Sequence, residues 1–169
     1  PLWSRGLGDV YKRQFLSFGH CFIVHILYLG RGSQVKIGLI AAMDQEARLL
    51  IEAITDLTKI NLGHLDFYQG LLGSSPVVLV QSGIGKVNAA IATSILISHF
   101  QADFIINTGS AGGIGSNLSI GDLVISDQVA YYDVDNRVFD YAYGQLPQMP
   151  AVYEVKPEFS KLAQDPVSY

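Results

Sequence analysis

A short apolar segment followed by a glycine-rich stretch most constrains the fold of this chain. Residues 104–106 (FII) have the length and composition of a buried strand, and residues 107–113 (NTGSAGG) follow directly. Glycine permits positive φ and close backbone approach, so the stretch can form a loop around a small polar molecule. In an open α/β sheet, ligands bind at this carboxyl edge of the strands. The stretch is a candidate binding loop, although an ordinary turn has the same composition.

Strand-like and helix-like segments alternate along most of the chain. Residues 35–41 (VKIGLIA) are apolar enough for a strand buried on both faces, as in a parallel sheet. In residues 44–54, Ala47, Leu50 and Ile51 recur at the spacing of one helical face. Further strands are predicted at 60–72, 76–81, 104–107 and 121–126, further helices at 86–100 and from Pro157 onward, and an aromatic loop at 131–149. The alternation indicates a mostly parallel α/β sheet.

Residues 1–34 differ from the rest of the chain. Their opening resembles translated adaptor sequence, and residues 15–30 form an apolar run interrupted by two histidines. The run is short for a membrane span, and no small-x-small cleavage site follows it, as a secretory signal would require. We therefore expect Val35 to be the native start. Residues 1–34 are predicted to be non-native and unpacked on the sheet, with residues 35–169 the N-terminal portion of one domain; a targeting segment is the alternative.

Composition argues against several classes of function. The formal net charge is −4 and Lys and Arg form no cluster, so nothing favours nucleic acid or an anionic membrane as a partner. Cys21 is the only cysteine, which excludes a disulfide framework and a cysteine metal site. The histidines show no ligand spacing, so we expect no metal and no cofactor. A reducing cytoplasm fits this composition.

Several short motifs occur in order after residue 35. They are AAMDQE at 41–46, SGIGKV at 82–87, NTGSAGG at 107–113, GD at 121–122 and YGQLP at 143–147. This ordered set resembles the bacterial 5′-methylthioadenosine/S-adenosylhomocysteine nucleosidases of the nucleoside phosphorylase superfamily. The resemblance implies a central mixed, largely parallel sheet flanked by helices. It also implies hydrolysis of adenine thionucleosides to adenine and a 5-thioribose, as in methionine salvage.

The resemblance assigns roles to individual residues. The reaction passes through an oxocarbenium-like sugar, so it needs a base for the attacking water and groups that hold the nucleoside. Glu46 matches the family's water-activating glutamate, and Ser110 matches the serine near the water and the ribose. From the residues alone, a solvated glutamate complementing the helix dipole is the simpler interpretation of Glu46. The nucleoside pocket is matched by Met43, Ile84, Ala111 and Gly112, which could otherwise be ordinary core or loop residues.

A further pair of assigned residues lies in the aromatic loop. Phe139 and Pro147 match the segment that a neighbouring subunit contributes over the 5′-substituent, so the resemblance implies a homodimer. The alternative is an aromatic loop folded onto its own domain. The family's acid for adenine and its ribose-binding Met-Glu pair would follow Tyr169. We therefore expect the chain as given to be C-terminally truncated, with an incomplete sheet, and inactive by itself.

Other activities remain open. A purine nucleoside phosphorylase would bind a dianionic phosphate, which Glu46 would repel, and no arginine occurs in the three strand-end loops to bind it. Futalosine hydrolase, a related nucleosidase, is not distinguished by these residues. Outside the enzymes, a non-catalytic nucleoside-binding chain is the alternative. The joint presence of Glu46 and Ser110 argues against it.

Overall fold

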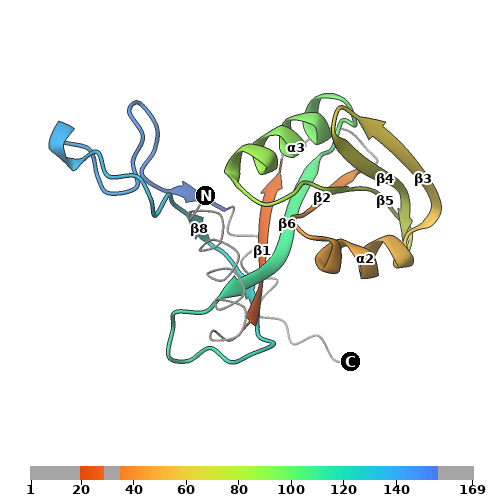
Figure 1. The fold of residues 1–169 in the computed structure, drawn as a ribbon, viewed down its shortest axis with the longest axis horizontal. Helices are drawn as coiled ribbons and strands as arrows, with labels where there is room; N and C mark the ends of the chain where they lie inside the picture. The colour runs from red at the N-terminus through yellow and green to blue at the C-terminus, as the bar shows by residue number, and fades with distance from the viewer. Residues whose placement is uncertain (1–19, 29–34, 156–169) are drawn as a thin grey trace, which may run out of the picture.

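Three parallel strands with largely apolar sequences form the centre of the fold. In the computed structural model, which describes residues 20–28 and 35–155, β2 (Ile37–Ala41) lies between β5 (Ser75–Gln81) and β6 (Phe104–Gly112) (Figure 1). Both pairings of β2 are parallel. Central parallel strands are covered on both faces, which explains the hydrophobic runs of β2, of β5 and of residues 104–106 in β6.

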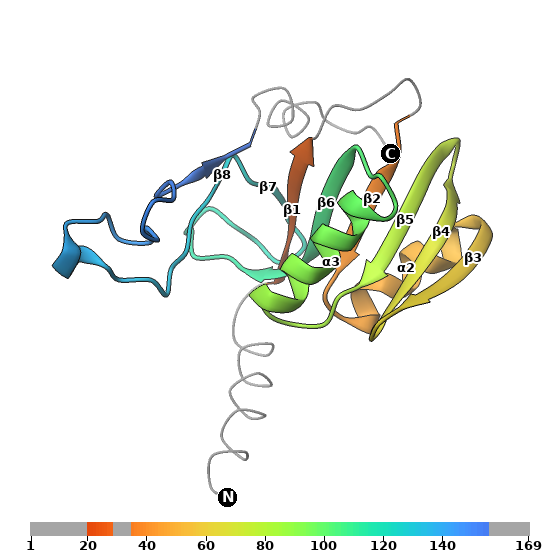
Figure 2. The ribbon, with the colours of Figure 1, turned by 90° about the horizontal axis from the view of Figure 1, so that it is seen from above.

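Two helices cover the two faces of these strands. They are α2 (Asp44–Ala53) and α3 (Lys86–Ser98). Because side chains of a strand alternate between faces, neighbouring residues of β5 belong to different cores. Leu79 packs in one buried cluster with Ala47 of α2, and Val80 packs in the other with Leu96 of α3. Figure 2 shows α3 on the near side of the sheet and α2 behind it.

An antiparallel hairpin forms one side of the sheet. It consists of β3 (Thr55–Leu62) and β4 (Leu65–Leu72), with β4 pairing antiparallel to β5. The single strand predicted over residues 60–72 is therefore wrong. The chain reverses near Gly63, which has a φ of +64°, a conformation that glycine adopts without strain. β3 is an edge strand with mostly exposed residues, so its polar sequence lacks the apolar pattern of a buried strand.

Two further strands extend the other side of the sheet. They are β1 (His20–Tyr28) and β7 (Leu123–Ile125), and the full strand order is β3-β4-β5-β2-β6-β1-β7. β1 runs antiparallel to β6 along its whole length and parallel to β7. The prediction that residues 1–34 pack on no part of the sheet is therefore wrong for residues 20–28. The other residues of that segment lie outside the described part, and Val35 as the native start stays a prediction.

The glycine-rich stretch is strand rather than loop as far as Gly112. β1 provides a ladder partner for every residue of β6, from Phe104 to Gly112. The backbone groups of the stretch therefore find hydrogen-bonding partners within a sheet, which sequence patterns of β6 alone do not reveal. The central mixed sheet flanked by helices is confirmed, with parallel pairings of β2 at its centre.

The segment after β7 leaves the sheet and forms an arm, defined here as residues 128–155. Short strands β8 (Gln128–Val129) and β9 (Tyr153–Glu154) pair antiparallel at its base, and a 3-10 helix η1 (Arg137–Phe139) lies in its irregular middle. Figure 1 shows the arm projecting away from the sheet. The aromatic loop predicted at 131–149 agrees with this structure. The helix predicted from Pro157 lies outside the described residues.

Candidate active site

The carboxyl ends of β2, β5 and β6 meet at one edge of the sheet, where the predicted site lies. β2 ends at Ala41, and Ala42 and Met43 lead into α2. β5 ends at Gln81, and the next residue, Ser82, donates its backbone N–H to the carbonyl of Ala41 at 2.9 Å. This hydrogen bond holds the loops after β2 and β5 side by side. The parallel order of the strands thus assembles the loops from separate parts of the sequence.

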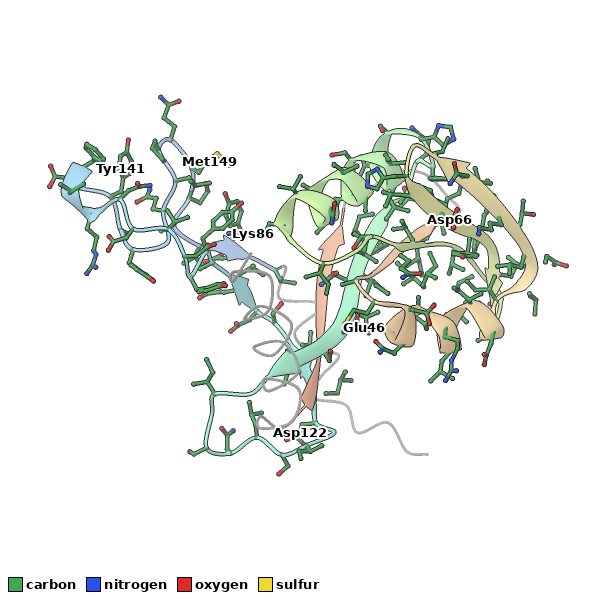
Figure 3. The ribbon with its side chains drawn as sticks, viewed as in Figure 1. Glu46, Asp66, Lys86, Asp122, Tyr141 and Met149 are labelled. Atoms are coloured by element: carbon green, nitrogen blue, oxygen red, sulfur yellow. The ribbon has the colours of Figure 1, made fainter. Side chains whose placement is uncertain are left out.

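Glu46 lies in the first turn of α2, and its carboxylate accepts four hydrogen bonds. Oε2 accepts from the backbone N–H groups of Ala42 at 3.1 Å and Met43 at 3.0 Å. Oε1 accepts from the backbone N–H of Ser110 at 2.8 Å and from its hydroxyl Oγ at 3.0 Å. An ionised carboxylate is an acceptor only, so it matches four donors without conflict. Figure 3 shows Glu46 beside the bend of β6, pointing from α2 toward the strand.

Gly109 makes the close approach of this carboxylate possible. A Cβ atom built on Gly109 would lie 2.8 Å from Oε1 of Glu46 and 3.0 Å from its Cδ. Those distances are shorter than ordinary van der Waals contacts, so any side chain on Gly109 would push the carboxylate away from Ser110. The glycine before Ser110 therefore has a steric role. The glycine content of this stretch predicted positive φ and close backbone approach to a ligand, and it gave no sign of this packing against Glu46.

Glu46 also caps its own helix. Met43 is the N-cap residue of α2, and a glutamate at the third helical position that accepts its backbone N–H forms half of a capping box. The simpler interpretation of Glu46 as a helix-stabilising carboxylate is thus partly right. It is incomplete, because the side chain is half-buried and its other oxygen bonds Ser110 on β6. The capping contacts fix the carboxylate at the strand edge and leave it with a defined orientation.

The other predicted nucleoside-binding residues of the domain lie at the same sheet edge. Met43 is half-buried at the start of α2, while Ala111 and Gly112 continue β6 beyond Ser110. Ile84 lies in the loop between β5 and α3, with 56% of its surface exposed. The structure therefore brings the Glu46 carboxylate into direct contact with Met43 and with Ser110, and it places Ile84 on the neighbouring loop.

Phe139 and Pro147 lie elsewhere, on the exposed part of the arm. Phe139 is 70% exposed, and Pro147 is exposed as well. Figure 3 labels Tyr141 and Met149 in this region, and both are far from Glu46. The arm of this chain is therefore not folded over its own Glu46.

A second feature that the sequence did not reveal is an ion pair between Lys86, the first residue of α3, and the arm. Nζ of Lys86 lies 2.6 Å from both carboxylate oxygens of Asp133. This hydrogen bond lowers the pKa of Asp133 below its ordinary value of 3.8. The partners are 47 residues apart in the sequence, and neither belongs to a spacing pattern that would join them.

No metal cluster or membrane helix occurs within the described ranges. Among residues 20–28 and 35–155, no three His, Cys, Asp or Glu side chains are grouped so that they could hold a metal ion. The same part of the chain contains no helix that is long and apolar enough to cross a bilayer.

Comparison with known proteins gives consistent matches. The sequence model of the phosphorylase superfamily matches residues 36–168. A 5′-methylthioadenosine/S-adenosylhomocysteine nucleosidase of Staphylococcus aureus (strain bovine RF122) is 50% identical over 129 residues, which cover 76% of this chain and 57% of that protein. The chain thus spans little more than half the length of the curated relatives it matches.

Solved structures of nucleosidases match a similar share of this chain. The nucleosidase of Colwellia psychrerythraea 34H in complex with adenine has a TM-score of 0.75 and 46% identity, covering 82% of this chain and 56% of that one. The S-adenosylhomocysteine nucleosidase of Streptococcus pyogenes in complex with 5-methylthiotubericidin has a TM-score of 0.73 and 43% identity, at 79% and 56% coverage. Futalosine hydrolase of Helicobacter pylori has a TM-score of 0.72 and 30% identity, at 77% and 56% coverage.

Proposed function

The chain belongs to the phosphorylase superfamily, and on that premise we propose that the whole protein hydrolyses the N-glycosidic bond of 5′-methylthioadenosine and S-adenosylhomocysteine. The products are adenine and the corresponding 5-thioribose. The observation that carries the proposal is the carboxylate of Glu46, held by four donors at the carboxyl edge of the sheet. The 50% identity to a nucleosidase over 129 residues supports the choice of substrate.

Glu46 is the proposed base, and Ser110 controls its access to water. In the reaction, a water oxygen bonds to the anomeric carbon and one water proton moves to the base, while the bond from that carbon to adenine breaks and its electron pair leaves with adenine, which takes a proton from the separate acid that the family resemblance implies. Of the four donors to Glu46, three are backbone N–H groups and only the Ser110 hydroxyl can rotate. Oε1 is therefore the oxygen that can exchange a hydrogen bond from Ser110 for one from the attacking water.

Hydrolysis fits this site better than phosphorolysis. A phosphate dianion at the place of the water would lie against the Glu46 carboxylate, and the repulsion between like charges is strong where water is scarce. The three strand-end loops contain no arginine that could neutralise it. We therefore assign water, rather than phosphate, as the nucleophile.

Futalosine hydrolysis is the second candidate within the same chemistry. The futalosine hydrolase structure has a TM-score close to those of the nucleosidases, so the fold does not separate the two. Identity does differ, at 30% for the futalosine hydrolase and 46% for the Colwellia nucleosidase. Comparing kcat/KM for methylthioadenosine and futalosine decides between them, and we expect methylthioadenosine to be preferred.

The proposed role of Glu46 is tested by Glu46→Gln in the complete protein. Release of adenine from methylthioadenosine should fall by about 10²–10⁴-fold, the usual contribution of a general base. Glu52→Gln is the matched control, because Glu52 lies exposed on the same helix. Near wild-type turnover in Glu46→Gln would show that the residue acts only as a helix cap.

A loss of activity must be separated from a loss of structure. The amide of glutamine would point its NH₂ group at backbone donors, and leaving such groups unpaired costs about 1–3 kcal/mol each. Circular dichroism and calorimetric binding of an uncleavable adenine nucleoside analogue supply this check. Folded Glu46→Gln protein that still binds the analogue but releases no adenine supports the base.

A two-fold homodimer is the proposed assembly, formed through the arm. Three of its apolar side chains, Tyr132, Val138 and Phe139, are 81%, 82% and 70% exposed, and exposed apolar groups of this kind mark interfaces. In the dimer, Phe139 and Pro147 would lie over the 5′-substituent in the partner's site. Sedimentation of the complete protein at micromolar concentration should give a dimer, weakened by Phe139→Ser. A fully active monomer would contradict this assembly.

The proposed place of action is the cytoplasm, where adenine thionucleosides would be recycled for methionine salvage. A single cysteine in the chain suits a reducing compartment. Fractionation of cells that express the complete protein should recover the activity with cytoplasmic markers. Recovery with membranes or secreted proteins would contradict the assignment.

A further inference from the structure

Lys86 joins the start of α3 to the arm. It is the first residue of α3, and its ammonium donates to both carboxylate oxygens of Asp133 at 2.6 Å. The same ammonium lies 4.9 Å from the centroid of the Tyr131 ring. Tyr131 in turn meets Tyr153 of β9 edge-to-face, with ring centroids 6.5 Å apart. One side chain of α3 therefore contacts the first part of the arm twice and, through Tyr131, reaches its last part.

The internal contacts of the arm hold it together as a unit. β8 and β9 form a two-stranded sheet of their own, separate from the seven-stranded sheet. Within the arm, the N–H of Gly144 donates to the carbonyl of Val134 at 2.9 Å, and a Cβ on Gly144 would lie only 2.5 Å from the carbonyl oxygen of Tyr131. These contacts shape the arm without fixing its direction relative to the domain. The contacts of Lys86 do link it to the domain.

The position of Lys86 is unfavourable for a cation that has no partner. A helix N-terminus carries partial positive charge, and the first turn of α3 contains no acidic residue. Asp133 supplies the missing negative charge from the arm. The hydrogen bond from Lys86 lowers the pKa of the Asp133 carboxyl, as expected for a carboxylate that faces a cation at 2.6 Å.

We propose that Lys86 is a positioning residue that fixes the direction of the arm relative to the loop at residues 82–85. The loop contains Ile84, which is assigned to the nucleoside in this chain's own site, and the arm contains Phe139, which is assigned to the nucleoside in the partner's site. The inference therefore rests on the proposed function for its substrate. Lys86 itself is assigned no contact with the reacting atoms. It acts through the arm, and it should therefore affect the affinity for substrate rather than the rate of bond cleavage.

The kinetic test compares Lys86→Met with Lys59→Met in the complete protein. Lys59 is a matched control on the β3–β4 hairpin. It pairs with Asp66 at 2.8 Å, lies 5.6 Å from the Tyr68 ring centroid, and has 56% side-chain exposure against 58% for Lys86. Lys86→Met should raise KM for methylthioadenosine by about 3–10-fold and change kcat by less than about twofold, as expected from losing an exposed ion pair and a cation–π contact. Lys59→Met should leave both unchanged.

Two further measurements distinguish loss of the ion pair from a general loss of stability: the dependence of KM on salt, and the KM of a conservative variant. The ion pair is exposed, so raising the ionic strength to about 0.5 M should increase KM of the wild type and have little effect on KM of Lys86→Met. Lys86→Arg keeps the charge and the ring contact, and it should restore most of the affinity. Equal salt responses of wild type and Lys86→Met, or no recovery with Lys86→Arg, would overturn the proposal.

Hydrogen exchange tests the same inference without any substrate. Amides of residues 130–152 should exchange faster in Lys86→Met than in the wild type, while those of β4 and β5 stay unchanged. Unchanged exchange in the arm would refute the positioning role. If the wild type fails to cleave methylthioadenosine, the proposed function fails, and the exchange result still decides whether Lys86 holds the arm.

Discussion

Replacing Gly109 with alanine should disable the Glu46 carboxylate while leaving the sheet folded. The added Cβ would lie 2.8 Å from Oε1 and 3.2 Å from Oε2, so the carboxylate has to move by about half an ångström to reach ordinary contact distance. Gly109 lies within β6, and its φ is not among the positive values, so alanine fits the backbone. The clash with Glu46 is therefore the expected consequence of the substitution.

The size of the effect follows from the contacts that are disturbed. Moving Oε1 lengthens its 2.8 Å and 3.0 Å hydrogen bonds to Ser110, each contributing about 1.5–3 kcal/mol because the acceptor is charged. A misplacement of about 1 Å at a catalytic group costs about 10²-fold in rate. For half that shift we expect kcat to fall by about 10–100-fold, with KM changed by less than about threefold. Overpacking should lower the free energy of unfolding by about 1–3 kcal/mol.

The assay is release of adenine from methylthioadenosine, measured in a double-mutant cycle. Glu46→Asp shortens the side chain and removes the atoms that the new Cβ would strike. The double variant Gly109→Ala/Glu46→Asp should therefore be no slower than Glu46→Asp alone. Additive losses in the double variant, or wild-type kcat in Gly109→Ala, would refute the steric coupling between these residues.

Two further predictions concern stability and pH. Phe67 is fully buried and its ring lies 4.8 Å from that of Phe100, so Phe67→Ala should lower the free energy of unfolding in urea by about 3–5 kcal/mol; a loss below about 1 kcal/mol would contradict this core. Hydrogen bonds from Arg137 lower the pKa of Asp135 from 3.8 to about 2. Because the folded pKa is the lower one, the contribution of the pair is complete above about pH 3.8 and is lost as the pH falls toward 2. Carboxyl NMR titration should show this low midpoint, and Arg137→Met should raise it toward 3.8.

The local periodicity of apolar residues was sufficient to predict the helices and strands that face the core. The apolar run of β2 and the helical spacing of Ala47, Leu50 and Ile51 correspond to buried or half-buried positions in the structure. The sequence did not predict β3 as a separate strand. It is an edge strand with mostly exposed side chains, so its sequence needs no alternation of apolar and polar residues. β1 was excluded wrongly because its place beside β6 depends on pairing between segments far apart in the sequence.

The proximity of two candidate residues was predictable from motifs, whereas the contacts that depend on packing were not. Glu46 and Ser110 could be singled out from ordered motifs, and the structure joins them directly although they are 64 residues apart. The steric role of Gly109 and the pairing of Lys86 with Asp133 follow from distances in space. A single amino-acid sequence does not show which residues lie at those distances from one another.

The most direct test of the account is the fate of oxygen from water in the reaction. The complete protein is incubated with methylthioadenosine in ¹⁸O-labelled water, with and without inorganic phosphate. The sugar product is reduced at once with borohydride, because a free anomeric hydroxyl exchanges its oxygen with water, and it is then analysed by mass spectrometry. Water activated by Glu46 predicts one ¹⁸O at the anomeric carbon of methylthioribose, a rate independent of phosphate, and loss of the labelled product in Glu46→Gln. A sugar phosphate without the label, formed only when phosphate is present, would contradict hydrolysis and the role assigned to Glu46.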